Sequence, residues 1–445
     1  MNKTFEHVAD TINPLRRKLL KYSLLGGALA APGVNLMAKP LATTANIVIV
    51  GVGAAGTAMA NRLRQQLAGN KITLVGARQQ HLYQPGYTMI ASGLWRADSV
   101  VTTTKEWLPK GVDWVEQDIS GIAPDAQQVL LADGSKLAYD ILVIATGCQL
   151  NFHLIEGMDE QLIGQNGVGC VYAGQDGALK TSQAIDAFAA KGEGKGIFTL
   201  THTFLKCAGA PIKMTFTSLS RLENTGRRQH FDISFTTPFE NRLFTVPVYN
   251  EFVLKRFAEQ DVAVKFQHKL TGIDAAKRQA YFTDLSGTVR REDYDFIHVV
   301  PPMSAPDAIR QSGLVWTEGP FANDWLEVDQ YTMQHRRYAN IFGIGDVVGT
   351  PLGKTAASVK MQAPVVEQNI LSYLSGAELT AQYNGYTSCP LITAIGKAVL
   401  AEFGYGNKLL PSFGFIDPTE ESWAVWVMKE KMLQPAYYAV LKGQV

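Results

Sequence analysis

The sequence predicts an α/β protein built of two Rossmann-like domains, the first of them discontinuous in sequence, with an aromatic-rich C-terminal tail. Three observations predict this fold class. An apolar run at 46–50 leads through a glycine loop into a stretch of helical character. A second alternation of apolar runs and helical stretches begins near Gly196. The chain of 445 residues, 46% hydrophobic and 18% charged, is long enough for two or three domains with a sizeable core.

The elements are expected in a regular order. In the first unit we expect strands at 46–50, 71–75, 129–131 and 139–145, and a helix at 57–67. In the second unit we expect strands at 197–201, 232–235, 262–267 and 279–283, and helices at 211–222 and 248–260. Strands at 296–300 and 340–346 and a helix at about 355–374 complete the α/β part.

These elements divide the chain into four parts. Residues 1–42 are interpreted as an export signal, and 43–160 with 290–375 as a cofactor-binding domain. Residues 161–289 form the second Rossmann-like domain, and 376–445 form a C-terminal region rich in glycine, proline and aromatic residues.

The N-terminal segment resembles a twin-arginine signal. Arg16 and Arg17 precede the weakly apolar stretch 22–31, and the small residues Ala38 and Ala42 follow at suitable cleavage points. Such a signal would place the mature protein in the periplasm, whereas a basic amphipathic arm is the alternative. No run of about 18 apolar residues occurs in the chain, so no helix is expected to span a bilayer and any membrane contact should be interfacial.

Charge excludes one class of partner. Lysine and arginine number 41 and aspartate and glutamate number 40, so no long-range field favours nucleic acid. The sequence is compatible with a homo-oligomer.

The glycine loop predicts a dinucleotide site. Gly51, Gly53 and Gly56 follow a strand and open a helix, with Ala54 and Ala55 between the last two glycines. The first glycine makes the turn, the second admits a pyrophosphate, and the third allows close packing of helix on strand. The acid that usually ends the second strand and binds a ribose is replaced by Gly76 and Ala77, so backbone groups or Arg78 are expected to hold the ribose instead.

Two later segments favour FAD as the dinucleotide. Ala145, Thr146 and Gly147 close a strand, as in flavoproteins with two dinucleotide-binding domains, and Gly345 with Asp346 resembles the segment that meets the flavin ribityl chain. A simple turn is the alternative for the Gly-Asp pair. The remaining residues expected at the cofactor are Gln84, Lys354 and Thr355.

The second unit lacks a glycine loop where a nicotinamide site would need one. Cys207 stands in the turn before the expected helix and follows Lys206. A helix N-terminus and a neighbouring cation favour a thiolate, so the electron donor is expected to react with a thiol rather than to be NAD(P)H. The four cysteines are Cys148, Cys170, Cys207 and Cys389, and none has the spacing of a metal site.

The cysteine segments resemble those of the sulfide:quinone oxidoreductases, in the branch that includes the mitochondrial enzymes. The resemblance rests on Lys206-Cys-Ala-Gly-Ala-Pro211 and Asn384-Gly-Tyr-Thr-Ser-Cys-Pro-Leu391, with His81-Leu-Tyr-Gln-Pro85, Gln334-His-Arg-Arg337 and Leu400-Ala-Glu-Phe403 in support. It implies that Cys207 and Cys389 form a redox disulfide. Hydrogen sulfide would leave a persulfide on Cys389, a small thiophilic acceptor would remove the sulfur, and FAD would pass two electrons to a membrane quinone.

The resemblance also implies a quinone pocket in the tail and a protein that is peripheral on the inner membrane. Phe403, Tyr405, Phe413 and Phe415 are expected to line it, although core packing is the alternative for each, and Lys429 matches a family lysine near flavin and quinone. Lys206 would stabilise the Cys207 thiolate and His202 is a candidate proton carrier. Two other functions stay open: a flavoprotein subunit that gives its electrons to a cytochrome, and a persulfide-binding sulfur carrier.

Overall fold

The computed structural model describes residues 39–444. From Ala42 onward the described residues form one compact unit. The expected export signal falls almost wholly on residues 1–38, outside the described part, so it stays a prediction. No helix among residues 39–444 is long and apolar enough to cross a membrane.

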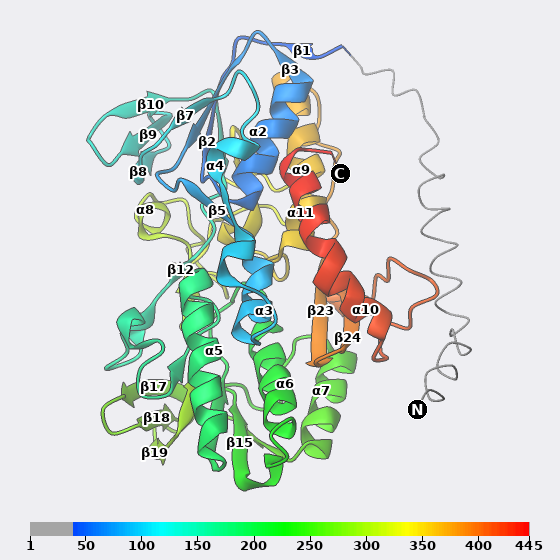
Figure 1. Ribbon diagram of the computed structural model, residues 1–445. Coiled ribbons are helices and arrows are strands. Elements are labelled where there is room, and N and C mark those ends of the chain that lie inside the picture. The colour runs from blue at the N-terminus through cyan, green and yellow to red at the C-terminus, as the bar shows by residue number, and fades with distance from the viewer. Residues whose placement is uncertain (1–38, 445) are drawn as a thin grey trace. The chain divides into compact units, whose positions relative to one another are not determined.

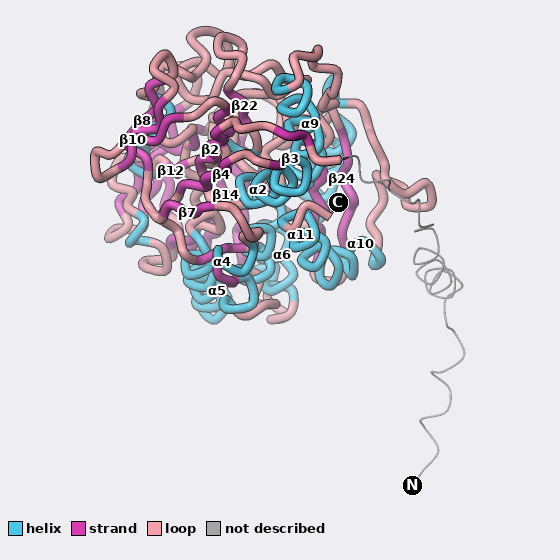
Figure 2. The backbone as a smooth tube through the Cα atoms, turned by 90° about the horizontal axis from the view of Figure 1, so that it is seen from above, coloured by secondary structure: helices cyan, strands magenta, loops and turns pink. Residues whose placement is uncertain are grey.

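The first sheet is parallel and has five strands in the order β22-β11-β2-β4-β7. Figure 1 labels β2 and β7 of this sheet, and Figure 2 shows β22, β2, β4 and β7 in the same order. The strands are β2 (Asn46–Val50), β4 (Lys71–Val75), β7 (Asp113–Val115), β11 (Ile141–Ile144) and β22 (Ile341–Gly343). β2, β11 and β22 are runs of buried apolar residues, as parallel strands covered on both faces require. Helix α2 (Ala54–Gln66) packs on β2 and β4, and α9 (Ala356–Leu374) lies beside α2. Since β22 and α9 return from late in the chain, this unit is discontinuous, as predicted.

The second sheet is also parallel, in the order β13-β20-β14-β15-β16. Its strands are β13 (Val168–Gly169), β14 (Gly194–Thr199), β15 (Phe231–Thr236), β16 (Val262–Lys265) and β20 (Phe296–His298). Helices α5 (Gly174–Lys191), α6 (Ala210–Glu223) and α7 (Pro247–Glu259) accompany it. The sequence placed 296–300 with the cofactor domain, but β20 pairs with β14, so the chain returns to the first domain later than residue 290.

Small antiparallel sheets and short helices complete the α/β part. One sheet comprises β8 (Ile119–Ala123), β9 (Gln128–Leu131) and β10 (Lys136–Ala138), and another comprises β17 (Lys269–Asp274), β18 (Gln279–Thr283) and β19 (Val289–Asp293). The other elements are β1 (Leu41–Ala42), β3 (Leu67–Ala68), β5 (Gln80–Leu82), β6 (Val101–Thr103), α3 (Tyr87–Ala91), α4 (Thr104–Trp107) and α8 (Asp307–Arg310).

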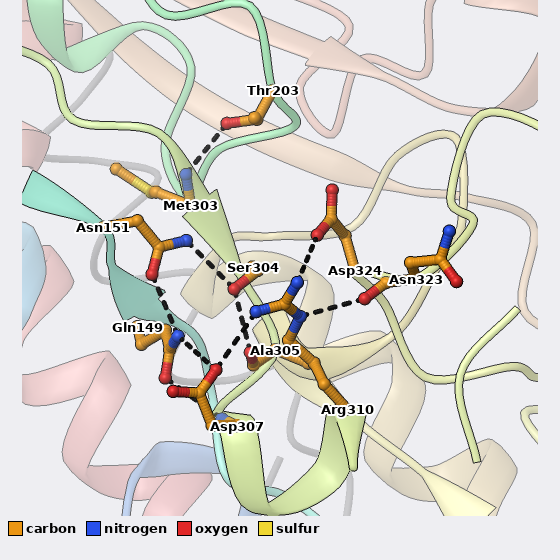
Figure 3. A network of polar contacts seen from close by, with 10 residues as sticks. All are labelled: Gln149, Asn151, Thr203, Met303, Ser304, Ala305, Asp307, Arg310, Asn323 and Asp324. Carbon is orange, nitrogen blue, oxygen red and sulfur yellow. Dashed lines mark hydrogen bonds and ion pairs between the residues drawn. The ribbon is translucent and has the colours of Figure 1, made fainter. Parts of the chain in front are cut away.

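Two segments that connect the first and second sheets, one after β11 and one after β20, are held together by a polar network (Figure 3). Strand β12 (Gln149–Leu150) pairs antiparallel with β21 (Met303–Ser304). Gln149 donates to Asp307 at 2.9 Å, and Asn151 donates to Ser304 at 3.0 Å. The backbone N–H of Met303 donates to Thr203 at 2.9 Å, which ties this network to the loop that follows β14.

The C-terminal region packs onto both α/β units. It contains β23 (Thr387–Ala394), β24 (Lys397–Phe403), α10 (Trp423–Val427), a π-helical turn at Met428–Met432 and α11 (Leu433–Leu441). The β23-β24 hairpin lies against α6, as Figure 1 shows, and α11 lies beside α2, as Figure 2 shows. The tail is therefore part of the core of the folded unit.

Candidate functional site

A cavity of about 950 Å³ lies at the carboxyl ends of the strands. Its wall is formed by the segments after β2, β4, β11 and β22 in the first sheet, the segment after β14 in the second, and parts of the C-terminal region. This is where open α/β sheets bind ligands. The expected cofactor residues on the wall are Gly51, Gly53, Ala54, Ala55, Arg78, Gln84, Ala145, Thr146, Gly147, Gly345, Asp346, Lys354 and Thr355.

The glycines of the first loop are required by close backbone contacts. Gly51 has a φ of +112°, and a Cβ there would collide with the carbonyl oxygen of Ala145. Gly56 lies inside α2 and is not part of the cavity wall; a Cβ there would collide with the carbonyl oxygen of Gly51. The third glycine therefore acts through packing of helix on loop, as its place in the motif predicts.

The cavity wall beside this loop offers groups that fit FAD. The guanidinium of Arg78 lies 3.5 Å from the position that a Cβ on Gly53 would occupy, beside the loop, which suits a pyrophosphate. The hydroxyl of Thr146 is buried and has no hydrogen-bond partner among the described residues, so it is available to a ligand. Gly76 stands where related sites have an acidic residue. Asp118, which follows β7, adds a carboxylate to the cavity wall.

The start of α9 forms the opposite wall. Thr355 is its N-cap and accepts from the backbone N–H of Ser358 at 3.1 Å. The Lys354 ammonium donates to the carbonyl oxygens of Asp346 and Val348 at 2.8 and 2.6 Å and lies 3.5 Å from the centre of the Trp325 ring. Burial lowers the pKa of Lys354 to about 7. Burial also disfavours the charged form of Asp346 and therefore raises the pKa of this carboxyl group.

Cys207 lies in a strained turn that is fixed from both sides. Its φ is +49°, in the left-handed region that non-glycine residues rarely adopt. Its backbone N–H donates to the carbonyl oxygen of Lys354 at 2.9 Å, and the Tyr172 hydroxyl donates to its carbonyl oxygen at 3.1 Å. The cysteine loop of the second unit is thus bound directly to the start of α9 in the first.

Cys389 is brought to the same place by strand β23. A Cβ added to Gly209 would lie only 2.5 Å from the Cys389 sulfur, so this glycine lets the hairpin approach the loop. Both cysteines line the cavity, and all four cysteines of the chain are free thiols in the structure. Residues 182 positions apart in sequence therefore meet beside the cofactor wall.

Lys213 joins the two thiols. Its ammonium donates to the Cys207 sulfur at 3.3 Å and to the Cys389 sulfur at 3.6 Å, and the residue is only 4% exposed. The hydrogen bond from Cys389, together with Lys213, holds the pKa of Cys207 well below its ordinary value, although burial opposes this. The same hydrogen bond, with burial, raises the pKa of Cys389 well above its ordinary value. The Cys389 hydrogen bond and Lys213 therefore favour the thiolate form at Cys207, whereas the same hydrogen bond and burial favour the thiol form at Cys389.

Two catalytic expectations do not fit the structure. The Lys206 ammonium donates to Gln84 at 2.9 Å and is not among the groups that lower the pKa of Cys207. Lys206 and Cys207 are neighbours in one turn, whereas Lys213 returns toward the thiols from α6, so the thiolate partner is Lys213. His202 is exposed and does not line the cavity, so the structure does not bring this candidate proton carrier to the sulfurs.

Lys429 enters the cavity from the π-helical turn. Its ammonium donates to the carbonyl oxygen of Pro85 at 2.6 Å, and the residue is 2% exposed. Burial, followed by the charge of Lys213, lowers its pKa to about 7. Single π-helical turns are often found at functional sites, because they turn one side chain off the regular helical spacing.

The aromatic residues expected at the quinone divide into two groups. Phe413 lines the cavity. Phe403 is buried against Phe244 and Tyr249. Tyr405 is half-buried, and its hydroxyl donates to the carbonyl oxygen of Gln330 at 2.8 Å. Phe415 is 64% exposed beside Phe413, and none of Phe403, Tyr405 and Phe415 belongs to the cavity wall. Core packing, the alternative left open by the sequence, fits Phe403.

Sequence reasoning missed Lys213, Tyr172 and Asp118. A signal for Lys213 was present: it is a lysine within an otherwise apolar stretch, six residues after Cys207. The turn at 170–173 that carries Tyr172 is held by hydrogen bonds from the backbone N–H groups of Cys170 and Val171 to Thr181 and His298. Such long-range contacts have no sequence signature.

Comparisons with known proteins agree with this site. Residues 45–183 match the family described as pyridine nucleotide-disulphide oxidoreductase. The mitochondrial sulfide:quinone oxidoreductase of Mus musculus is 31% identical over 434 residues, 96% of this chain and 94% of that protein. The mitochondrial sulfide:quinone oxidoreductase of Dictyostelium discoideum is 34% identical over 408 residues, 91% of this chain and 88% of that protein.

A solved structure has the same fold. The sulfide:quinone oxidoreductase of Aquifex aeolicus superposes with a TM-score of 0.74 at 21% identity, over 90% of this chain and 92% of that one. The two-sheet architecture and the cofactor wall described above are those of FAD-dependent oxidoreductases, and FAD is the cofactor of this chain. Because relatives at 31% and 34% identity each align with more than nine-tenths of it, the chain belongs to the sulfide:quinone oxidoreductase family.

Proposed function

We propose that this protein oxidises hydrogen sulfide at Cys207 and Cys389 and passes two electrons through FAD to a membrane quinone. The observation that supports it most is the position of the two cysteines: they come from distant segments, share the ammonium of Lys213 and line the cavity that also contains the FAD residues. When bound, FAD accepts an electron pair from a dithiol and passes it to a quinone.

The sulfur chemistry follows from thiol–disulfide exchange. Hydrosulfide attacks the Cys389 sulfur of the Cys207–Cys389 disulfide; a persulfide forms on Cys389 and the Cys207 thiolate leaves. An anionic thiophilic acceptor then takes the outer sulfur and leaves a thiolate on Cys389. The two sulfurs can then rejoin as a disulfide, which releases an electron pair that bound FAD would accept.

The difference in pKa between the two thiols supports attack at Cys389. The leaving sulfur should be the one with the lower pKa, and Lys213 together with the Cys389 hydrogen bond lowers the pKa of Cys207. Attack at Cys389 therefore expels the better leaving group.

The quinone is proposed to reach the cavity near Phe413 and Lys429. Phe413, Phe415, Trp423 and Met432 are large apolar side chains of the C-terminal region that are each at least 38% exposed. We call these four residues the apolar rim. Exposed aromatic and apolar residues of this kind suit an interfacial contact with a membrane surface. We further propose that residues 1–42 direct twin-arginine export to the periplasm, which a reporter fused after Ala42 tests by its location.

The function is tested with the purified FAD protein under anaerobic conditions. Sulfide is expected to bleach the flavin band, and a decyl-quinone is expected to restore it. Cys207→Ser and Cys389→Ser should each abolish bleaching, whereas Cys170→Ala, a buried cysteine outside the cavity wall, serves as the control. Bleaching that survives in either serine variant contradicts the proposed mechanism. Bleaching without quinone reduction would point to a cytochrome acceptor, and no bleaching would point to a sulfur carrier.

A further inference from the structure

Lys213 is a buried cation whose counter-charge is a sulfur atom. Among the described residues its ammonium has hydrogen bonds only to Cys207 and Cys389 and no carboxylate partner. Burial alone would lower its pKa, but the two sulfurs raise it above the ordinary value. Lys429 adds a second ammonium to the same region, since its charge and that of Lys213 affect each other.

The charge balance of this pocket depends on the redox state of the cysteines. In the reduced pair, the Cys207 thiolate neutralises Lys213. In the disulfide both sulfurs are neutral, and the ammonium is left in a buried position without an anion. An uncompensated buried charge is costly, so the oxidised pocket favours either loss of the lysine proton or capture of an anion.

We propose that, in the oxidised protein, Lys213 forms a binding site for one small monoanion, which the reduced protein lacks. This inference rests on the proposed function, because hydrosulfide is then the anion that enters. It is held beside Cys389, its sulfur bonds to the Cys389 sulfur, and the bond between the Cys389 and Cys207 sulfurs breaks. The negative charge that arrived on hydrosulfide ends on Cys207, so it stays next to the same ammonium throughout the step.

Azide is a suitable probe because it is a small monoanion that does not reduce a disulfide. Isothermal titration under anaerobic conditions compares the oxidised FAD protein with protein that has been reduced and desalted. A charge-assisted hydrogen bond contributes about 1.5–3 kcal/mol, so azide should bind the oxidised form at least about tenfold more tightly. Lys213→Met should remove this difference, and Lys213→Arg, which keeps the charge, should retain part of it.

A second measurement keeps the inference testable without sulfide turnover. In the reduced protein, the pH profile of Cys207 alkylation by iodoacetamide, read by mass spectrometry, reports the pKa of this thiol. Lys213→Met should shift that profile to higher pH. Lys255→Met removes an exposed lysine from α7 and should leave the profile unchanged. A profile that does not move in Lys213→Met overturns the assigned role.

The outcomes separate this inference from the proposed function. Redox-dependent azide binding without flavin bleaching by sulfide would support the anion site and contradict sulfide oxidation. Bleaching by sulfide with equal azide binding in both redox states, or with azide binding that survives Lys213→Met, would overturn the anion site alone. FAD content and circular dichroism of each variant identify a protein that has failed to fold, and Lys213→Arg then becomes the deciding variant.

Discussion

At the scale of single residues, Gly209 determines how near the two cysteines can come. A Cβ at this position would lie 2.5 Å from the Cys389 sulfur, closer than real contacts allow. Gly209→Ala should therefore push β23 away from the cysteine loop. Since misplacement of a reacting group by about 1 Å can cost about a hundredfold in rate, sulfide-driven bleaching should slow by about that factor. Stopped-flow absorbance at the flavin band measures it.

The matched control is Gly121→Ala on β8. The nearest atom to a Cβ there is 3.6 Å away, and the backbone has no positive φ. FAD content should be normal in both variants, because neither glycine touches the glycine loop. A Gly209→Ala protein that bleaches at the normal rate would mean that the thiols need not approach closely.

The second residue-scale prediction concerns pH and Lys429. Burial first, then Lys213, lowers the pKa of Lys429 to about 7. Its ammonium is present below that pH and lost above it, so a step that needs a proton from Lys429 should slow as pH rises through about 7. Reoxidation of the reduced flavin by decyl-quinone between about pH 6 and pH 9 measures this step. Lys429→Met should be slow and flat across the range, and a wild-type rate that does not fall contradicts the role.

The residues that could be predicted from sequence are those whose roles depend on near neighbours. Gly51 and Gly56 act within one strand–loop–helix unit, and the structure places both where the motif predicts. The sequence favours Lys206 as the thiolate partner, because Lys206 is adjacent to Cys207. The partner is Lys213, because the helix after the loop turns its side chain back to the thiols. Adjacency along the chain is a poor guide to contact inside a turn.

At the scale of elements, helix α11 closes one side of the cofactor cavity. It contributes Leu433, Ala436, Tyr437, Ala439 and Val440 to the wall. The Tyr437 hydroxyl lies 2.6 Å from Nε2 of His81, and Tyr438 stacks on Trp107 with ring centres 4.6 Å apart. The C-terminal helix is thereby fixed to β5 and to the end of α4, so its packing should contribute to FAD retention.

Tyr437→Ala tests this role of α11. Removal of a buried aromatic side chain costs about 3 kcal/mol and opens the wall, so the purified protein should contain less FAD and unfold at a lower temperature. The ratio of flavin to protein absorbance and thermal unfolding with added FAD measure the two effects. Tyr373→Ala on α9, where the side chain is 38% exposed, is the control. Full FAD content in Tyr437→Ala would exclude α11 from cofactor retention.

The elements predicted best are those with a continuous or an alternating apolar pattern. The strands at 46–50 and 71–75 are apolar β-branched runs, the strand at 279–283 alternates between buried and half-buried residues, and all three have the expected bounds. Helix α5 was missed; its sequence contains Gly174 and Gly177, and its stability comes from packing on α3 and β13. The β23-β24 hairpin was also missed, since its burial depends on α6.

At the scale of the whole molecule, the two sheets supply different halves of one site. The first supplies the FAD wall and the start of α9, and the second supplies the Cys207 loop. The hydrogen bond from the Cys207 backbone to Lys354 and the network at β12 and β21 fix the halves to each other. The second sheet supplies Cys207, whereas Cys389 comes from β23 in the C-terminal region. The cavity therefore forms only when all three parts are folded together.

The last prediction concerns the apolar rim of Phe413, Phe415, Trp423 and Met432. Burial of one large apolar side chain contributes about 1.5–3 kcal/mol, so replacing all four with serine should weaken binding to phospholipid vesicles by more than about tenfold. Turnover with a long-chain quinone held in the vesicles should fall with binding. Leu285→Ser with Val289→Ser provides the control, because it removes two well-exposed side chains, 70% and 59%, from the turn after β18 and from the start of β19. Bleaching by sulfide should persist in every variant, because the thiols are untouched. Unchanged vesicle binding in the rim variant would mean that another face meets the membrane.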